Sequence, residues 1–284
     1  FLTVIYVIYR PVFGKMMKKD SASEAIPSGE IYKTILLTMA PIIIGQTLYN
    51  VSAVIDDMMY SNMQAVRDTA ATIKTDLGNF SSSYSLLISI PQGIASAMSA
   101  SMLPSVVTSF TEKKYKDVRT KINSTLKTNM FIAVPSFVGL TVLGEPVIKL
   151  LFSRYNSAQG AMMLKIGAIA VVFYTLSTVT SSALQGINRM SVPVKHSFVA
   201  LVIHIILVFS LLKWSRLGIY AIVIGNATFP LLILILNLIS LKRYIGFMME
   251  YVKVFAVPGV CSVIMGIVTW AVYTIVYTLA ASNI

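Results

Sequence analysis

Small polar side chains recur on one face of a strongly apolar segment of this chain. Between residues 83 and 110, a stripe repeats in steps of four, three, four and three residues: Ser85, Ser89, Gln92, Ser96 and Ser99. These steps keep side chains on one face of an α-helix, because successive residues turn by about 100°. Such a stripe can line a hydrated path, or it can hold helices together through hydrogen bonds.

Two further apolar segments carry similar stripes. Between residues 161 and 188 the same steps join Tyr174, Thr178, Ser181, Gln185 and Asn188, and an earlier segment places Gln46, Asn50 and Asp57 on one face. Hydroxyl groups alone fit close helix packing as well as they fit a cavity. The amides in all three segments favour a cavity, and we predict a substrate path lined by Gln46, Asn50, Ser85, Ser89, Gln92, Ser96, Tyr174, Thr178, Gln185 and Arg189.

Few ionisable residues lie near these segments. Asp56 and Asp57 are adjacent acids at the end of one segment, and they either bind a coupling cation, carry a proton or simply end the helix in water. His204 lies within another segment, where it is either a helix contact or a proton relay. His196 and the single Cys261 have no neighbouring ligands in the sequence, so we expect no metal site and no disulfide.

The elements that must position these residues are long apolar segments. They run approximately over 31–55, 83–110, 129–144, 161–182, 196–212, 217–240 and 254–280. A bilayer crossing needs about 20 apolar residues, so the sequence predicts seven spans of an all-α, polytopic membrane protein. Within them, Pro41, Pro91 and Pro104 remove backbone donors and permit bends, and we expect them to act in gating.

The basic residues indicate the orientation of these spans. Of the 23 Lys and Arg residues, sixteen lie on one alternate set of connections and six on the other, with Lys165 inside a span. By the positive-inside rule the first set is cytoplasmic, which places the protein in the cell membrane as a multi-pass protein. The net charge of +12 sits beside spans, where it attracts anionic membrane lipids. We therefore expect no nucleic-acid partner.

The chain also shows an internal organisation. Residues 1–9 resemble the end of a severed transmembrane helix, and residues 10–30 form a polar, mixed-charge linker. Residues 111–128 combine basic and apolar positions at helical spacing, which predicts an amphipathic helix on the inner leaflet. No phosphate-binding loop, HExxH or GxSxG motif occurs, so we expect no enzyme.

The order of several short motifs resembles a known family. The motifs are Val-Ile-Asp56-Asp57, Ser89-Ile-Pro91-Gln92-Gly93, Ser101-Met-Leu-Pro104-Ser and Leu184-Gln185-Gly186-Ile-Asn188. The basic helix predicted over 111–128 lies between the third and fourth of them. A chain with these motifs in this order is similar to the SpoVB and MurJ-like polysaccharide-biosynthesis flippases. These flippases belong to the multidrug/oligosaccharidyl-lipid/polysaccharide (MOP) exporter superfamily.

The resemblance implies two six-helix lobes, related to the multidrug and toxin extrusion (MATE) fold, around a central cavity. Residues 31–240 would form the second lobe and residues 241–284 an additional transmembrane helix, with the N-terminal lobe missing. The implied function is outward movement of an undecaprenyl-linked saccharide, such as lipid II, by alternating access. Arg189 would steer its pyrophosphate, unless membrane topology alone places a basic residue there.

The function remains open between three alternatives at this point. A flippase lobe for peptidoglycan or polysaccharide precursors is favoured, without a bound cofactor and with coupling to a sodium ion, a proton or the membrane potential. A cation-coupled efflux transporter for small molecules is the second alternative. The third is a membrane scaffold in envelope or spore assembly, in which the polar stripes serve only as helix contacts.

Overall fold

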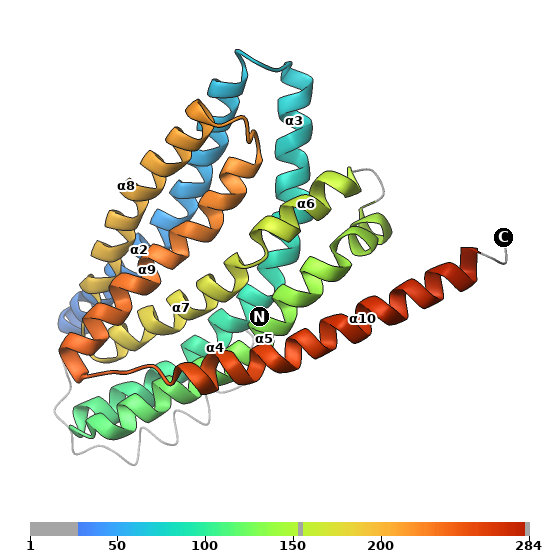
Figure 1. Cartoon of the computed structure of the whole chain (residues 1–284). Helices are drawn as coiled ribbons and strands as arrows, with labels where there is room; N and C mark the ends of the chain where they lie inside the picture. The colour runs from blue at the N-terminus through green and yellow to red at the C-terminus, as the bar shows by residue number, and fades with distance from the viewer. Residues whose placement is uncertain (1–27, 153–155, 282–284) are drawn as a thin grey trace. The chain divides into compact units, whose positions relative to one another are not determined.

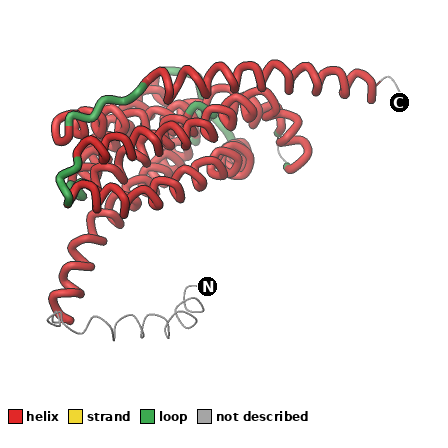
Figure 2. The backbone as a smooth tube through the Cα atoms, turned by 90° about the horizontal axis from the view of Figure 1, so that it is seen from below, coloured by secondary structure: helices red, strands yellow, loops and turns green. Residues whose placement is uncertain are grey.

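The computed structural model describes residues 28–152 and 156–281, and all regular structure in these residues is helical (Figures 1 and 2). The first helices are α2 (Ser28–Gln64), α3 (Ala70–Asn79), the π-helix η1 (Phe80–Ser85), α4 (Leu86–Thr111) and α5 (Tyr115–Leu151). They are followed by α6 (Ser157–Gly167), α7 (Ala170–Gly186), α8 (Ser191–Trp214), α9 (Tyr220–Ile245), the π-helix η2 (Val252–Ala256) and α10 (Val257–Ala281). The prediction of an all-α protein is confirmed.

The chain divides inside α2 into two compact units, Phe1–Ala40 and Pro41–Ile284. The described part of the first unit, residues 28–40, is helical. The second unit contains every contact considered below. The predicted helix stub at 1–9 and most of the predicted linker at 10–30 lie outside the described residues. The division into a second lobe over 31–240 and an additional helix stays a prediction.

The described residues contain five helices that are long and apolar enough to cross a bilayer, over 70–111, 115–151, 191–214, 220–245 and 252–279. A sixth span results if the bent pair α6 and α7 counts as one. Six of the seven predicted spans overlap these elements when the bent pair counts as one. The first predicted span, 31–55, lies within α2, which is not among them, and stays a prediction.

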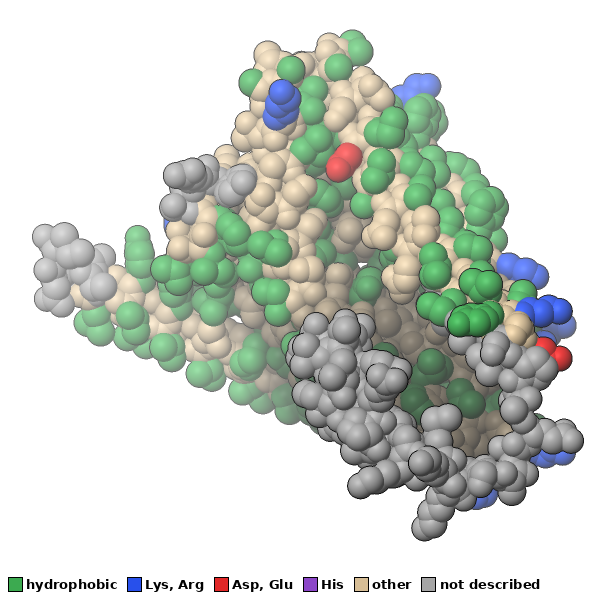
Figure 3. All heavy atoms as spheres, turned by 180° about the vertical axis from the view of Figure 1, so that it is seen from behind, with side chains coloured by type: hydrophobic (Ala, Val, Ile, Leu, Met, Phe, Trp, Pro, Cys, Tyr) green, Lys and Arg blue, Asp and Glu red, His purple; other side chains and the backbone are tan. Residues whose placement is uncertain are grey.

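Apolar side chains dominate the exposed surface of these helices. Phe198, Ile206, Ile267 and Trp270 are all more than half exposed. On the face drawn in Figure 3, hydrophobic side chains cover much of the coloured surface, whereas Lys and Arg gather toward its edges. Such an apolar surface suits contact with lipid, because lipid tails solvate hydrocarbon side chains but not charges.

Helix α7 is the most enclosed part of the second unit. It packs against α4, α5, α8 and α9, and more than half of its residues are buried. Its Leu176 and Leu184 are fully buried, as are Met163 and Leu164 of α6 and Ile222 of α9. Because lipid is as apolar as these side chains, close packing and hydrogen bonds hold the helices together.

The predicted amphipathic helix over 111–128 is wrong as a separate element on the inner leaflet. Residues 115–128 instead form the first part of α5, which continues without a break to Leu151. Their apolar positions, Val118, Ile122 and Leu126, are all fully buried in the protein core. The helical spacing of these apolar residues therefore indicates a helix face that packs against other helices rather than against lipid.

Candidate functional site

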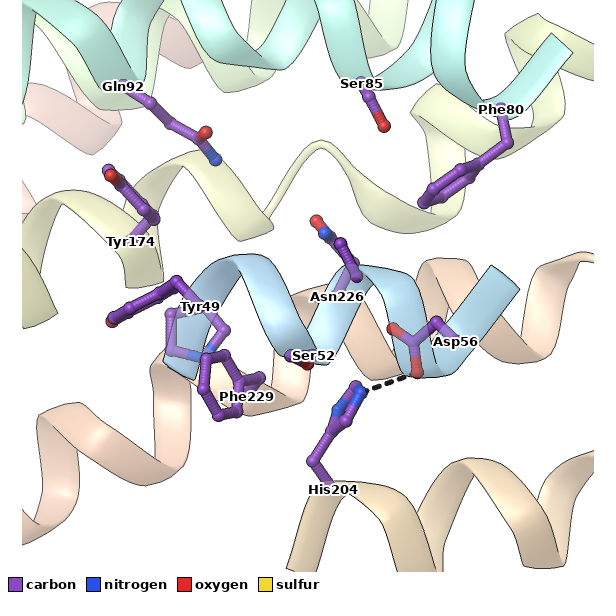
Figure 4. A pocket seen from close by; sticks show the side chains of 12 residues that line it. Tyr49, Ser52, Asp56, Phe80, Ser85, Gln92, Tyr174, His204, Asn226 and Phe229 are labelled. Carbon is purple, nitrogen blue, oxygen red and sulfur yellow. Dashed lines mark hydrogen bonds and ion pairs between the residues drawn. The ribbon is translucent and has the colours of Figure 1, made fainter. Parts of the chain in front are cut away.

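A polar cavity lies between α2, η1, α4, α7, α8 and α9 of the second unit (Figure 4). It has a volume of about 140 Å³ and is lined by Tyr49, Ser52, Ala53, Asp56, Phe80, Ser85, Gln92, Tyr174, His204, Asn226, Phe229 and Pro230. Because a buried water needs about 10 to 15 Å³ of such space, several waters fit among these hydroxyl, amide and acidic groups.

Two ionisable side chains meet at one end of this cavity. The Nε2 atom of His204 lies 2.8 Å from Oδ1 of Asp56, as the dashed line in Figure 4 marks. His204 is fully buried and Asp56 is 4% exposed. Asp56 comes from α2 and His204 from α8. The pair thus joins two helices through residues that are 148 positions apart in sequence. The Nδ1 atom of His204 has no hydrogen-bond partner in the described part of the chain.

Aromatic rings form another wall of the cavity. The ring of Tyr49 meets those of Tyr174 and Phe229 edge to face, with centroids 5.8 Å and 4.9 Å away. Phe229 also meets the imidazole of His204 at 5.4 Å. The Tyr49 hydroxyl lies 3.3 Å from Oγ of Ser177. These contacts connect α2 to α7 and α9 and fix the position of the Tyr49 side chain.

A π-helical turn precedes the serine stripe. Phe80 and Ser85 are the first and last residues of η1, and both line the cavity. Between them, the Tyr84 hydroxyl lies 3.0 Å from the carbonyl oxygen of Gly167 and 3.3 Å from Oδ1 of Asn226. Wide turns of this kind are frequent at functional sites, because they redirect side chains from the regular helical face.

The structure brings four of the predicted site residues to the cavity. Ser85 and Gln92 reach it from η1 and α4, Tyr174 from α7, and Asp56 from α2. Asp57, next to Asp56, is half-buried and does not line the cavity. Figure 4 shows Gln92 and Ser85 across the cavity from the α2 residues Tyr49 and Asp56.

Other members of the predicted stripes lie elsewhere. Ser89 is exposed and donates to the carbonyl of Leu86, while half-buried Ser96 donates to that of Gln92. Thr178 is half-buried and does not line the cavity. Gln46 and Asn50 are exposed on α2. A common helical face therefore does not by itself bring side chains to one cavity.

Gln185 lines a separate surface pocket beside the turn between α4 and α5. This pocket of about 400 Å³ also contains Lys113 and Asn188. Arg189 is exposed, and its guanidinium carbon lies 4.7 Å from the centroid of the Tyr244 ring. The geometry gives Arg189 a cation–π contact with α9 and does not place it at the cavity.

The three prolines predicted to act in gating lie inside continuous helices. Helix α2 runs through Pro41, and α4 runs through buried Pro91 and exposed Pro104. The sharp break of 47° lies instead between α6 and α7, after Gly167. The sequence gives no proline signal there.

Several cavity residues were absent from the prediction. Sequence reasoning missed Ser52, Asn226, Phe229 and the pairing of His204 with Asp56. A usable signal existed for the pair, because ionisable groups at membrane depth usually pair with one another. His204 and Asp56 are candidates for such pairing on two different helices. In the described residues, no three His, Cys, Asp or Glu side chains converge as a metal site would need.

Comparisons with known proteins give a consistent result. The family model "Lipid II flippase MurJ" matches residues 28–281. The chain is 28% identical over 184 residues to the lipid II flippase MurJ of Bacillus subtilis (strain 168), covering 64% of this chain and 34% of that protein. It is 25% identical over 165 residues to a probable lipid II flippase MurJ of Bdellovibrio bacteriovorus, covering 56% and 31%. The chain thus spans about a third of the length of these curated relatives, and no solved structure matches it.

Proposed function

The chain belongs to the lipid II flippase MurJ family of multi-pass membrane proteins, and from this premise we propose that it forms one lobe of such a flippase. The lobe contributes a polar wall along which the saccharide headgroup of an undecaprenyl-linked precursor crosses the cell membrane. The lipid tail stays in the bilayer, where the exposed apolar surface of the helices accommodates it. The membership identifies a transporter family rather than a catalytic one.

The observation that carries this proposal is the polar cavity in the bundle. Amide and hydroxyl groups of Gln92, Asn226, Ser52 and Ser85 line it at the level of the spans. These groups are unfavourable in hydrocarbon, but they can exchange hydrogen bonds with water and with sugar hydroxyls. A hydrated wall of this kind lowers the barrier to moving a polar headgroup across the bilayer.

Alternating access requires the cavity to widen, because about 140 Å³ holds water rather than a headgroup. Helix α2 is the element best placed to move. It meets the other helices of the second unit through side chains, including the Tyr49 contacts, the Asp56–His204 bond and a 2.5 Å hydrogen bond from Tyr60 to Asp76. Breaking these contacts, together with the apolar packing of Leu48 and Ile55 against α8 and α9, would open the cavity without disturbing the core around α7.

Replacement of Gln92 by Leu tests the proposal in cells. Gln92→Leu removes an amide from the cavity at similar volume, and we expect the complete reading frame with this change to lose at least tenfold in lipid II export. The assay is growth, together with lipid II accumulation, in a bacterium whose own lipid II flippase is depleted. The matched control is Thr108→Val, an exposed position on the same helix whose hydroxyl donates to the carbonyl of Pro104.

The control should support growth as the unchanged protein does. Full export by Gln92→Leu would contradict a path through this cavity. Failure of the unchanged protein to relieve lipid II accumulation would favour the small-molecule exporter or the scaffold.

A further inference from the structure

We propose that a pocket at the cytoplasmic end of the helices is a docking site for the phosphate-bearing saccharide headgroup of a lipid-linked precursor. This turn pocket is lined by Val107, Phe110, Thr111, Lys113, Tyr115, Gln185, Gly186, Asn188 and Met190. None of these residues lines the polar cavity that contains Asp56. The inference rests on the proposed function, because it names the place where the headgroup first meets the protein.

The turn pocket lies on the side of the membrane where outward movement begins. It is formed where α4 and α7 end, beside the turn of residues 112–114 before α5 and the turn of residues 187–190 before α8 (Figure 1). Both turns belong to the connections that the positive-inside rule places in the cytoplasm. A headgroup on this side can therefore reach the turn pocket before it enters the bundle.

The size and packing of the turn pocket suit a small-molecule group. Its volume is about 400 Å³, against about 140 Å³ for the polar cavity. Pockets that bind small molecules have volumes of about 300 to 1,000 Å³. Helices α4 and α7 pack closely beside it, since a Cβ added at Gly186 would lie 2.7 Å from Cγ1 of Val106. This close packing holds the two helix ends together, so the pocket is formed before a ligand binds.

The groups that line the turn pocket match the chemistry of a sugar. Phe110 and Tyr115 form an aromatic wall, with their rings edge to face and their centroids 5.9 Å apart. Such rings offer apolar surface on which the C–H face of a sugar ring can pack. Gln185 and Asn188 add amides, which can both donate to and accept from sugar hydroxyls. Neither amide has a side-chain hydrogen bond within the described part of the chain, so both are available to a ligand.

The charge of the turn pocket suits a phosphate. Lys113 brings an ammonium group to it, and no Asp or Glu is among the residues that line it. Two neighbouring cations have other partners: Lys114 pairs with Glu112 at 2.9 Å, and the guanidinium carbon of Arg189 lies 4.7 Å from the centroid of the Tyr244 ring. The ammonium of Lys113 has no ion-pair partner among the described residues. A phosphate on the ligand would supply one through a charge-assisted hydrogen bond.

The backbone of both turns is strained at the turn pocket. Lys113 and Asn188 have φ angles of +58° and +59°, and glycines alone share a positive φ with them in the described residues. Each follows the end of a helix: the N–H of Lys114 donates to the Ser109 carbonyl at 2.9 Å, and α7 ends in the same way. Glycine fits this position best, so the two side chains are present at a cost in backbone strain. Strain of this kind clusters at ligand-binding sites.

A sugar-linked phosphate fits these groups better than an ordinary phospholipid does. Both ligands offer phosphate oxygens to Lys113. A phospholipid such as phosphatidylglycerol has no ring to pack on the aromatic wall of Phe110 and Tyr115. The saccharide of the precursor supplies this ring, together with hydroxyl groups for the two amides.

Photo-crosslinking tests docking at the turn pocket without transport. The complete protein, in nanodiscs of phosphatidylcholine, carries a benzophenone amino acid in place of Tyr115, which keeps an aromatic ring there. The probe is a radiolabelled saccharide joined through pyrophosphate to a short isoprenoid chain. We expect saturable labelling that Lys113→Gly and Gln185→Leu each reduce at least fivefold. Lys116→Gln is the matched control, because Lys116 is exposed near the turn but does not line the pocket, and it should not alter labelling.

The Lys113→Gly variant separates loss of binding from loss of folding. Glycine adopts a positive φ without strain, so this variant should unfold at a temperature close to or above that of the unchanged protein. Labelling that neither Lys113→Gly nor Gln185→Leu reduces would overturn the proposal. Labelling that excess phosphatidylglycerol displaces as readily as the unlabelled probe does would also overturn it, because the pocket would then bind an ordinary phospholipid.

Transport then separates docking from the proposed function. In proteoliposomes with the complete protein, Lys113→Gly should raise the concentration of lipid-linked saccharide that gives half-maximal translocation at least fivefold, at an unchanged maximal rate. Lys116→Gln should leave both quantities unchanged. An unchanged half-maximal concentration for Lys113→Gly, in a protein that does move the saccharide, would refute docking as a step of transport. Labelling of the turn pocket in a protein that moves no saccharide would instead refute the proposed function and leave the binding site standing.

Discussion

At the scale of residues, the polar side chains of the spans fall into two groups. Hydroxyl groups such as those of Ser89 and Ser99 donate to carbonyls of their own helix, so they need no partner helix. Several amide and ionisable groups instead reach across helices, as His204 does to Asp56. The sequence could predict stripes from spacing, and Ser85 and Gln92 do reach the cavity. It could not predict which neighbouring helix each group faces, because spacing fixes a helical face but not what packs against it.

Asn237 gives a prediction at this scale. It is fully buried on α9, where its Oδ1 accepts from Nδ1 of His196 at 2.7 Å and its Nδ2 donates to Oγ of Ser181 at 2.9 Å. Asn237→Ala leaves these half-buried partners unsatisfied, and we expect it to lower the free energy of unfolding by about 1 to 3 kcal/mol. Denaturant unfolding in detergent micelles measures this change.

The control for Asn237 is Ser89→Ala, which removes an exposed hydroxyl bonded within its own helix. It should alter stability by less than about 0.5 kcal/mol, as is usual for exposed positions. Equal stability of the two variants would contradict the view that the amide network holds α7, α8 and α9 together.

At the scale of elements, hydropathy predicts where the helices lie but does not predict where they bend or break. Six predicted spans match helices of the structure, because long apolar segments at membrane depth must be helical. The π-helix η1 and the break after Gly167 were not predicted. Both depend on tertiary contacts, chiefly those of Tyr84, which bonds the Gly167 carbonyl at 3.0 Å. No local pattern of residues in the sequence predicts such a contact.

The break between α6 and α7 requires a glycine at the end of α6. A Cβ added at Gly167 would lie 2.3 Å from Cγ1 of Val223 and 2.5 Å from the Tyr84 hydroxyl. Gly167→Ala should therefore force α6 away from α9 and destabilise the protein by about 1 to 3 kcal/mol, as overpacking does. Thermal unfolding in detergent should show a lowered midpoint.

Gly139→Ala on α5 is the matched control, because a Cβ there would meet no atom within 4 Å. It should preserve the midpoint or raise it slightly, since Ala favours helix more than Gly does. A midpoint for Gly167→Ala as high as that of the control would show that the close approach at Gly167 is not needed.

At the scale of the whole molecule, the family match and the apolar helices agree on a multi-pass membrane protein, and the structure adds a polar cavity. Charge distribution and hydropathy indicated the membrane, and the order of short motifs indicated the family. The residues that line the cavity could not be predicted, because they come from six helical elements whose packing cannot be read from the sequence. The chain spans about a third of its curated relatives, so the proposed path requires a test in the complete reading frame.

The most direct test is translocation of a fluorescent lipid-linked saccharide in proteoliposomes that contain the complete reading frame, this chain alone or the Gln92→Leu variant. We expect rapid movement by the complete protein, no movement above empty liposomes by this chain alone, and at least a tenfold loss in the variant. Absence of movement by the complete protein under every imposed ion gradient and voltage would contradict the account.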